Sequence, residues 1–149
     1  MMRQVRRLCI VCTMAVVSAC HSNALEREFF NQPLGDRIER LRQLPLEEQY
    51  EIFRYGNDVI HPPLMDLADP IAERGATAVP FLIRQLKIEQ DDLATRDILL
   101  IFNRMARLKA YDVRADKVLM ETLSANVAKM RDDGWRHIAQ RSLDEIKNP

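Results

Sequence analysis

The stretch that decides the fold is Ile71-Ala-Glu-Arg-Gly-Ala-Thr-Ala-Val-Pro-Phe-Leu-Ile-Arg-Gln-Leu86. Gly75 ends one helical pattern, and Thr77 is placed to cap the next helix. Pro80 falls in the first turn of that helix, where its missing N–H costs little. The apolar residues that follow share one helical face: Leu82, Ile83 and Leu86. The stretch therefore predicts one helix ending and another beginning across a tight turn.

The rest of the chain is also predicted to be helical, because it shows no alternating strand pattern from Asp36 onward. Glycines and prolines separate apolar helical patterns. These patterns predict helices at residues 36–44, 46–56, 63–74, 77–89, 92–108, 113–130 and 134–147. We expect Pro70 to kink the third of these helices. The fold class predicted is all-α.

Two of the expected helices carry distinctive apolar patterns. The helix at 92–108 is apolar over a wide arc, so we expect neighbours on more than one side: Ile98, Leu99, Ile101, Phe102, Met105 and Leu108. The helix at 134–147 is expected to turn these residues inward: Trp135, Ile138, Ala139, Ser142, Leu143 and Ile146.

An internal repeat relates the two halves of the helical region. A shift of 41 residues places Asp92, Ile98, Phe102 and Met105 on Asp133, Ala139, Leu143 and Ile146. A shift of 37 residues places Leu82, Ile83 and Leu86 on Leu119, Met120 and Leu123. A helix pair that recurs at this interval has the period of HEAT or armadillo arrays.

Residues 71–86 also resemble the HEAT-like pattern, in which a glycine turn precedes Ala-Val-Pro-x-Leu-Ile-x-x-Leu. The resemblance implies a short array of antiparallel helix pairs, and an irregular helical bundle is the alternative. It also implies that the chain binds another macromolecule on an extended face.

The beginning of the chain has the features of an export signal. Arg3, Arg6 and Arg7 precede the apolar segment 8–19, which is shorter than the roughly 20 residues that a membrane-spanning helix needs. The order Val17-Ser18-Ala19-Cys20 resembles the lipobox of bacterial lipoproteins. That resemblance implies cleavage before Cys20, lipid on its thiol and an acylated new amino terminus.

These features predict a signal peptide at 1–19, a lipidated tether at 20–35 and a helical domain at 36–149. The expected location is the cell envelope, on the periplasmic or extracellular side. His21 replaces the aspartate that favours inner-membrane retention, so the outer membrane is expected in a Gram-negative host. The alternatives are ordinary cleavage after Ala24 and an uncut leader that tethers the chain.

Composition narrows the function classes further. The chain has 22 basic and 22 acidic residues, and loss of the leader with its three arginines leaves a net charge of about −3. Such a charge is not typical of a nucleic-acid-binding domain. Cys9 and Cys12 lie in the leader, so Cys20 is the one cysteine expected in the mature chain. We therefore expect no disulfide, no metal site and no cofactor.

His61 is the best catalytic candidate, because it lies in an expected loop between Asp58 and Asp66. No second histidine lies near it in the sequence, and no cysteine remains to complete a metal set. The favoured interpretation is a turn histidine, and an envelope hydrolase centred on His61 is the alternative. No nucleophile-elbow, P-loop, zinc-protease or dinucleotide motif is present, which argues against an enzyme.

Partner-binding candidates are Trp135, Arg104 and Arg107, because Trp and Arg are enriched at binding hot spots. A core role is favoured for Trp135. Arg104 and Arg107 share a helical face, Arg96 lies about 80° away around the same helix, and Arg114 follows just beyond it. These arginines could grip a phosphate or lipid headgroup. The favoured interpretation of these arginines is a solvated face with acidic neighbours such as Asp97.

The acidic pairs at 91–92 and 132–133 are predicted to cap helices rather than bind a cation. Taken with the leader and the repeat, these observations predict an anchored extracytoplasmic lipoprotein. It would bind a protein partner as an adaptor, assembly factor or inhibitor.

Overall fold

A computed structural model describes residues 24–148, and this part of the chain is all-α, without strands. Residues 24–30 are helical. The elements that follow are η1 (Leu34–Asp36), α2 (Arg37–Gln43), α3 (Leu46–Asp58), η2 (Met65–Ala68), α4 (Asp69–Glu73), η3 (Gly75–Thr77), α5 (Val79–Ile88), α6 (Asp92–Arg107), α7 (Lys117–Lys129) and α8 (Asp133–Lys147). The leader and Cys20 lie outside the described residues. None of the described helices combines the length and apolar character needed to cross a membrane.

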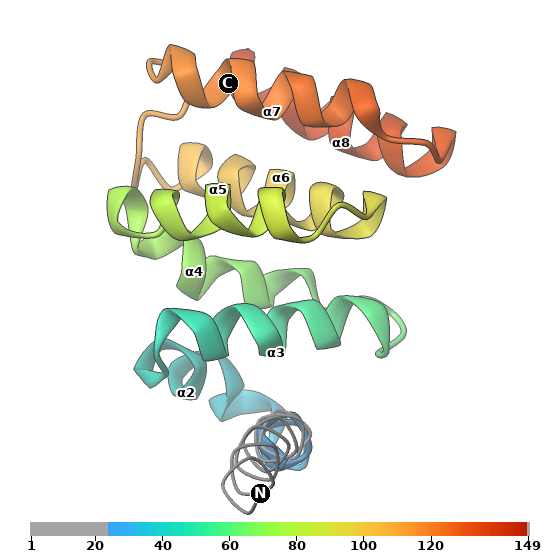
Figure 1. Cartoon of the computed structure of the whole chain (residues 1–149). Helices are drawn as coiled ribbons and strands as arrows, with labels where there is room; N and C mark the ends of the chain where they lie inside the picture. The colour runs from blue at the N-terminus through green and yellow to red at the C-terminus, as the bar shows by residue number, and fades with distance from the viewer. Residues whose placement is uncertain (1–23, 149) are drawn as a thin grey trace, which may run out of the picture.

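The helices are stacked in layers (Figure 1). Residues 24–30 and α2 lie at one end, followed by α3 with α4, then α5 with α6, and finally α7 with α8. The helices α3, α5 and α7 share one side of the stack, and α4, α6 and α8 lie behind them. Helix α6 is central, since it packs between α4 and α8 and also contacts α3, α5 and α7. The wide apolar arc predicted for this helix is thereby confirmed, except that Leu108 lies past its end and is exposed.

The internal repeat corresponds to equivalent buried positions in successive layers. The three apolar pairs 41 residues apart are buried: Ile98 and Ala139, Phe102 and Leu143, and Met105 and Ile146. In the fourth pair, Asp92 is half-buried and Asp133 is exposed. Leu82 and Leu86 of α5 are buried, as are Leu119 and Leu123 of α7. Across the layers, Asn103 Nδ2 donates to Glu145 Oε2 at 2.7 Å. The sequence offset therefore reports the step from one helix pair to the next.

The helices expected at 77–89 and 113–130 begin later than predicted, and Gly75 explains the first difference. Its φ of 55° and the 3-10 turn at Gly75–Thr77 delay α5 until Val79. Thr77 consequently does not cap α5; its Oγ1 donates to the carbonyl oxygen of Arg74 at 2.8 Å. The expected helix at 113–130 begins only at Lys117, because Asp116 accepts from the backbone N–H of Leu119 at 3.0 Å and caps it there.

The expected helix at 63–74 is two short elements rather than one kinked helix. Pro70 lies in the first turn of α4, where a proline needs no hydrogen-bonded N–H. The proline therefore begins a new helix after η2 instead of bending a longer one.

Residues 24–30 lie within the segment expected to be a tether, and they pack on the folded body. Phe29 is buried, and the Phe30 ring lies 5.4 Å from the ring of Tyr55. Gly56 permits this approach, because a Cβ there would lie 2.7 Å from Leu67 Cδ1 and 3.3 Å from Phe30 Cζ. The packed structure thus includes residues on the N-terminal side of the expected boundary at 36.

Candidate functional site

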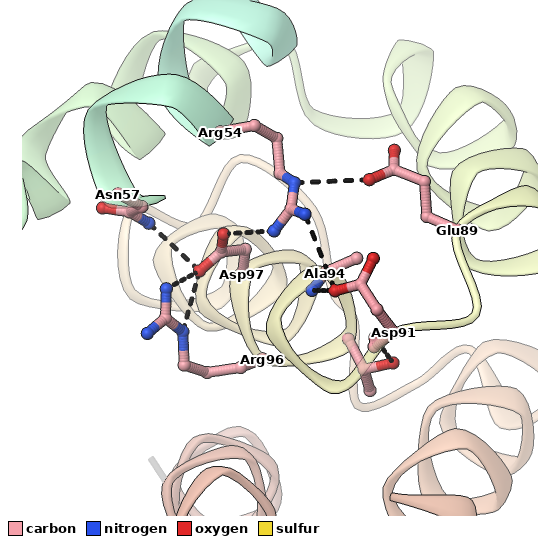
Figure 2. A network of polar contacts seen from close by, with 8 residues as sticks. Arg54, Asn57, Glu89, Asp91, Ala94, Arg96 and Asp97 are labelled. Atoms are coloured by element: carbon pink, nitrogen blue, oxygen red, sulfur yellow. Dashed lines mark hydrogen bonds and ion pairs between the residues drawn. The ribbon is translucent and has the colours of Figure 1, made fainter. Parts of the chain in front are cut away.

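Arg54 of α3 joins the second and third layers through a polar network (Figure 2). Its Nη1 donates to Asp97 Oδ2 of α6 at 2.7 Å. Its Nε pairs with Glu89 Oε2 at 3.3 Å, and its Nη2 lies 3.7 Å from Asp91 Oδ1. One guanidinium therefore meets three carboxylates from α6 and from the segment that joins α5 to α6.

Asp97 is the centre of this network and has no exposed surface. Its Oδ1 accepts from Asn57 Nδ2 at 3.1 Å and from Arg96 Nε at 2.8 Å, and Arg96 Nη2 donates to the same oxygen. Burial raises the pKa of Asp97, and the charges of Arg96 and Arg54 oppose that shift. A carboxylate in this setting is stabilised only while its partners remain in place.

Arg96 extends the network to the last layer. Its guanidinium carbon lies 4.5 Å from the centre of the Trp135 ring in α8, a cation–π contact. Arg96 itself is buried, so the expected solvated face is wrong for this arginine, although its predicted neighbour Asp97 is its partner.

Trp135 and Ile138 are not core residues, contrary to the expectation for 134–147. They are 37% and 40% exposed, whereas Ala139, Leu143 and Ile146 are buried as expected. Trp135 lies in the first turn of α8, where its ring covers Arg96 of α6. One face of α8 packs on α6 and α7, and no further helix of residues 24–148 covers its outer side.

A groove of about 450 Å³ lies between α3 and α5 and extends to residues 24–30. Three aromatic residues line it: Tyr50, Tyr55 and Phe81. Five acidic residues line it as well: Glu26, Glu47, Glu51, Asp58 and Glu89. Arg54 is the one basic residue among the lining residues, and the network described above engages it.

The Tyr50 side chain is unusual within this groove. The residue is only 4% exposed, and its hydroxyl has no hydrogen-bond partner among the described residues. Its ring meets Phe81 edge-on at a centroid distance of 5.4 Å. Burial, and after it the nearby charge of Glu89, raises the pKa of Tyr50, so the hydroxyl is neutral.

A second groove, of about 760 Å³, lies between α7 and the end of α5. Its lining includes Lys87, Lys129 and Arg131, so its charge is opposite to that of the first groove. Asp92 connects the layers here, because it accepts from the backbone N–H groups of Arg131 and Asp132 at 2.8 and 2.6 Å.

The residues of the hydrolase hypothesis are not assembled into a site. His61 is exposed in the connection between α3 and η2, and no hydrogen bond or ion pair in residues 24–148 joins it to Asp58 or Asp66. Asp66 instead accepts from Arg104 Nη2 at 3.1 Å. Within the same residues, no group of three His, Cys, Asp or Glu side chains could hold a metal ion.

The three partner-binding candidates have different neighbours and share no hydrogen-bond, ion-pair or cation–π partner among the described residues. Arg104 pairs with Asp66 and Asp69, Arg107 is exposed at the end of α6, and Trp135 lies over Arg96. Helix capping is confirmed for Asp91 and Asp132, which accept from Ala94 N at 2.7 Å and Trp135 N at 2.8 Å. Sequence reasoning did not single out Tyr50 or Arg54 as site residues, because nothing in the sequence places α3 beside α5.

No protein-family model matches the chain, and no curated protein or solved structure matches it.

Proposed function

We propose that the chain is a lipid-anchored protein of the bacterial cell envelope that binds another protein through the face formed by α3, α5 and α7. It would act as an adaptor, assembly factor or inhibitor. One observation carries the proposal: this face holds two grooves of opposite charge at successive layers of the stack. Extended faces of stacked helix pairs are suited to binding macromolecules.

The lipobox-like sequence supports the anchor. Each buried methylene of an acyl chain contributes about 0.8 kcal/mol, so several chains on Cys20 would hold the protein durably. Three residues separate Cys20 from Ala24, the first described residue, and this spacing spans at most about 14 Å. Under this proposal the body, and the groove at its N-terminal end, lie close to the bilayer surface.

Mass spectrometry of the protein purified from a bacterial host expressing the full chain tests the anchor. We expect a mature N-terminus at Cys20 that carries acyl mass. An unmodified cysteine in an unprocessed chain contradicts the anchor, and a mature N-terminus at Leu25 supports ordinary export instead.

Site-specific photo-crosslinking in intact cells tests the binding role. A photoreactive residue at Gln85 or Thr122 lies in one of the two grooves, and the exposed Lys147 of α8, which lines neither groove, is the matched control. We expect discrete adducts with an envelope protein from the groove positions and none from position 147. The proposal fails if the groove positions give no specific adduct across growth conditions.

A further inference from the structure

We propose that the groove between α3 and α5 receives a lysine- or arginine-rich segment of the protein partner. This inference rests on the proposed function and specifies the chemistry of the partner. It is carried by two features of the groove, its acidic lining and the buried Tyr50 hydroxyl, which has no hydrogen-bond partner of standard geometry among the described residues.

The acidic lining leaves the groove with excess negative charge. Arg54 is the one basic side chain in the lining, and its three closest acidic neighbours are Asp97, Glu89 and Asp91. Glu47, Glu51 and Asp58 are exposed and form no ion pair among the described residues. A concave surface lined by charge of one sign concentrates ions of the opposite sign.

The carboxylates of the groove also repel one another. Burial, and after it the charge of Glu51, raises the pKa of Glu26. A bound cation would relieve this repulsion, whereas an acidic segment would increase it. Charge complementarity therefore selects a basic occupant.

The Tyr50 hydroxyl is the second feature of the groove. Tyr50 lines the groove, and its hydroxyl has almost no exposed surface, lies close to Glu89 and makes no hydrogen bond of standard geometry among the described residues. Buried polar groups in folded proteins are nearly always hydrogen-bonded, so a donor brought to the groove wall beside Glu89 would complete the bonding of this neutral hydroxyl, whose oxygen can accept from an ammonium or guanidinium group.

The aromatic lining suits the rest of a basic side chain. Lysine and arginine bury their methylene stems against apolar surfaces while the charged end remains in a polar setting. Arg84 of this chain already lies 5.5 Å from the Phe81 ring, so the ring can accept a guanidinium as neighbour. The rings of Tyr50 and Tyr55 thus suit the methylene stem of a Lys or Arg side chain, and the acidic lining suits its charged end.

Fluorescence anisotropy with a labelled ten-residue peptide of alternating lysine and alanine tests the inference on the full-length expressed, purified protein. A peptide of alternating glutamate and alanine is the charge control, and spermidine is the competitor that represents a small polyamine. We expect the basic peptide to bind, the acidic one not to bind, and spermidine to compete only weakly. Binding of the acidic peptide, or spermidine binding as tight as the basic peptide, overturns the inference.

Variants locate the binding in the groove. Glu47→Gln/Glu51→Gln removes two exposed charges and should weaken the affinity for the basic peptide by about five- to tenfold. Tyr50→Phe removes only the hydroxyl and should weaken the affinity for the basic peptide by about threefold or more. The matched control Glu28→Gln/Glu121→Gln removes two exposed carboxylates outside the groove, and equal losses in the control and the groove variants overturn the inference. Circular dichroism confirms that each variant is folded.

The crosslinking experiment separates this inference from the proposed function. Glu47→Gln/Glu51→Gln is introduced into the chain that carries the photoreactive residue at Thr122, which lies in the other groove. Loss of the adduct in the double variant supports the inference. An undiminished adduct overturns it and leaves the binding role intact, whereas the absence of any adduct in the parent chain contradicts the binding role itself.

Discussion

Asp97→Asn is the substitution that most directly tests how the layers are held together. The asparagine has nearly the same size as the aspartate, so no cavity forms and the change is mainly electrostatic. It removes the negative charge that Arg54 and Arg96 share, and it places an amide donor where one oxygen had accepted. Because Asp97 is wholly buried, water cannot replace the lost acceptor.

The structure sets the size of the effect. A single ion pair at about 4 Å is worth about 4 kcal/mol at an effective dielectric of about 20, and removing one partner of a buried pair typically costs about 3–5 kcal/mol. Arg54 is 19% exposed and keeps Glu89 and Asp91 as partners, which moderates the loss. We expect a fall of about 3–4 kcal/mol in the free energy of unfolding, a large part of the roughly 5–15 kcal/mol typical of a domain.

Urea unfolding at pH 7, followed by circular dichroism, measures this loss. With a urea dependence of about 2 kcal/mol/M, the midpoint should fall by about 2 M. Asp36→Asn is the control, because Asp36 is exposed and makes no side-chain cap hydrogen bond to α2. A loss below about 1 kcal/mol, or one no larger than in the control, would refute the assignment of Asp97 as the centre of the network.

Three further outcomes follow from single contacts. Tyr50→Phe should raise the free energy of unfolding of the ligand-free protein by about 1 kcal/mol in urea unfolding, because it removes a buried hydroxyl that lacks a partner; a clear loss of stability would contradict this. Gly75→Ala should lower the thermal midpoint and cost about 2 kcal/mol or more, since φ is 55° and a Cβ would collide with the carbonyl oxygen of Ala110; an unchanged midpoint is the opposing result. Arg42 donates two hydrogen bonds to Glu73 and holds the pKa of Glu73 below its ordinary value of 4.5. The stabilisation from this pair is present above the unfolded pKa and is lost as pH falls through the folded one, so the stability difference between wild type and Glu73→Gln should shrink from pH 7 to pH 3.

The helices were predictable where local chemistry alone determines them. Asp91 and Asp132 begin α6 and α8 as side-chain caps, and the apolar faces that follow are buried. The offset of 41 residues was informative because buried positions recur in successive layers. The prediction that Thr77 caps the next helix was wrong because Thr77 belongs to the 3-10 turn Gly75–Thr77, and α5 begins only at Val79.

The candidate site was not predictable, because it depends on residues far apart in the sequence. Asp97 accepts from Arg54 and Asn57, which lie 43 and 40 residues away. From the sequence alone, the charged pair at 96–97 is expected to face solvent. The residues that bury it, Arg54 and Asn57, belong to another layer. Trp135 was predicted to lie in the core because its side chain is large and apolar, but it lies in the first turn of α8, and the residue is 37% exposed.

Arg54 connects the acidic groove to the buried polar network. Its charged group is held at Asp97 behind the groove, while its side chain lines the groove beside Tyr50 and Glu89. The network therefore fixes α3 relative to α6, and with it the spacing between α3 and α5 on the opposite side of the stack. A preorganised groove loses less conformational entropy when a partner binds. In this arrangement the buried charges stabilise the register of the layers, and the exposed carboxylates at the groove remain available for recognition.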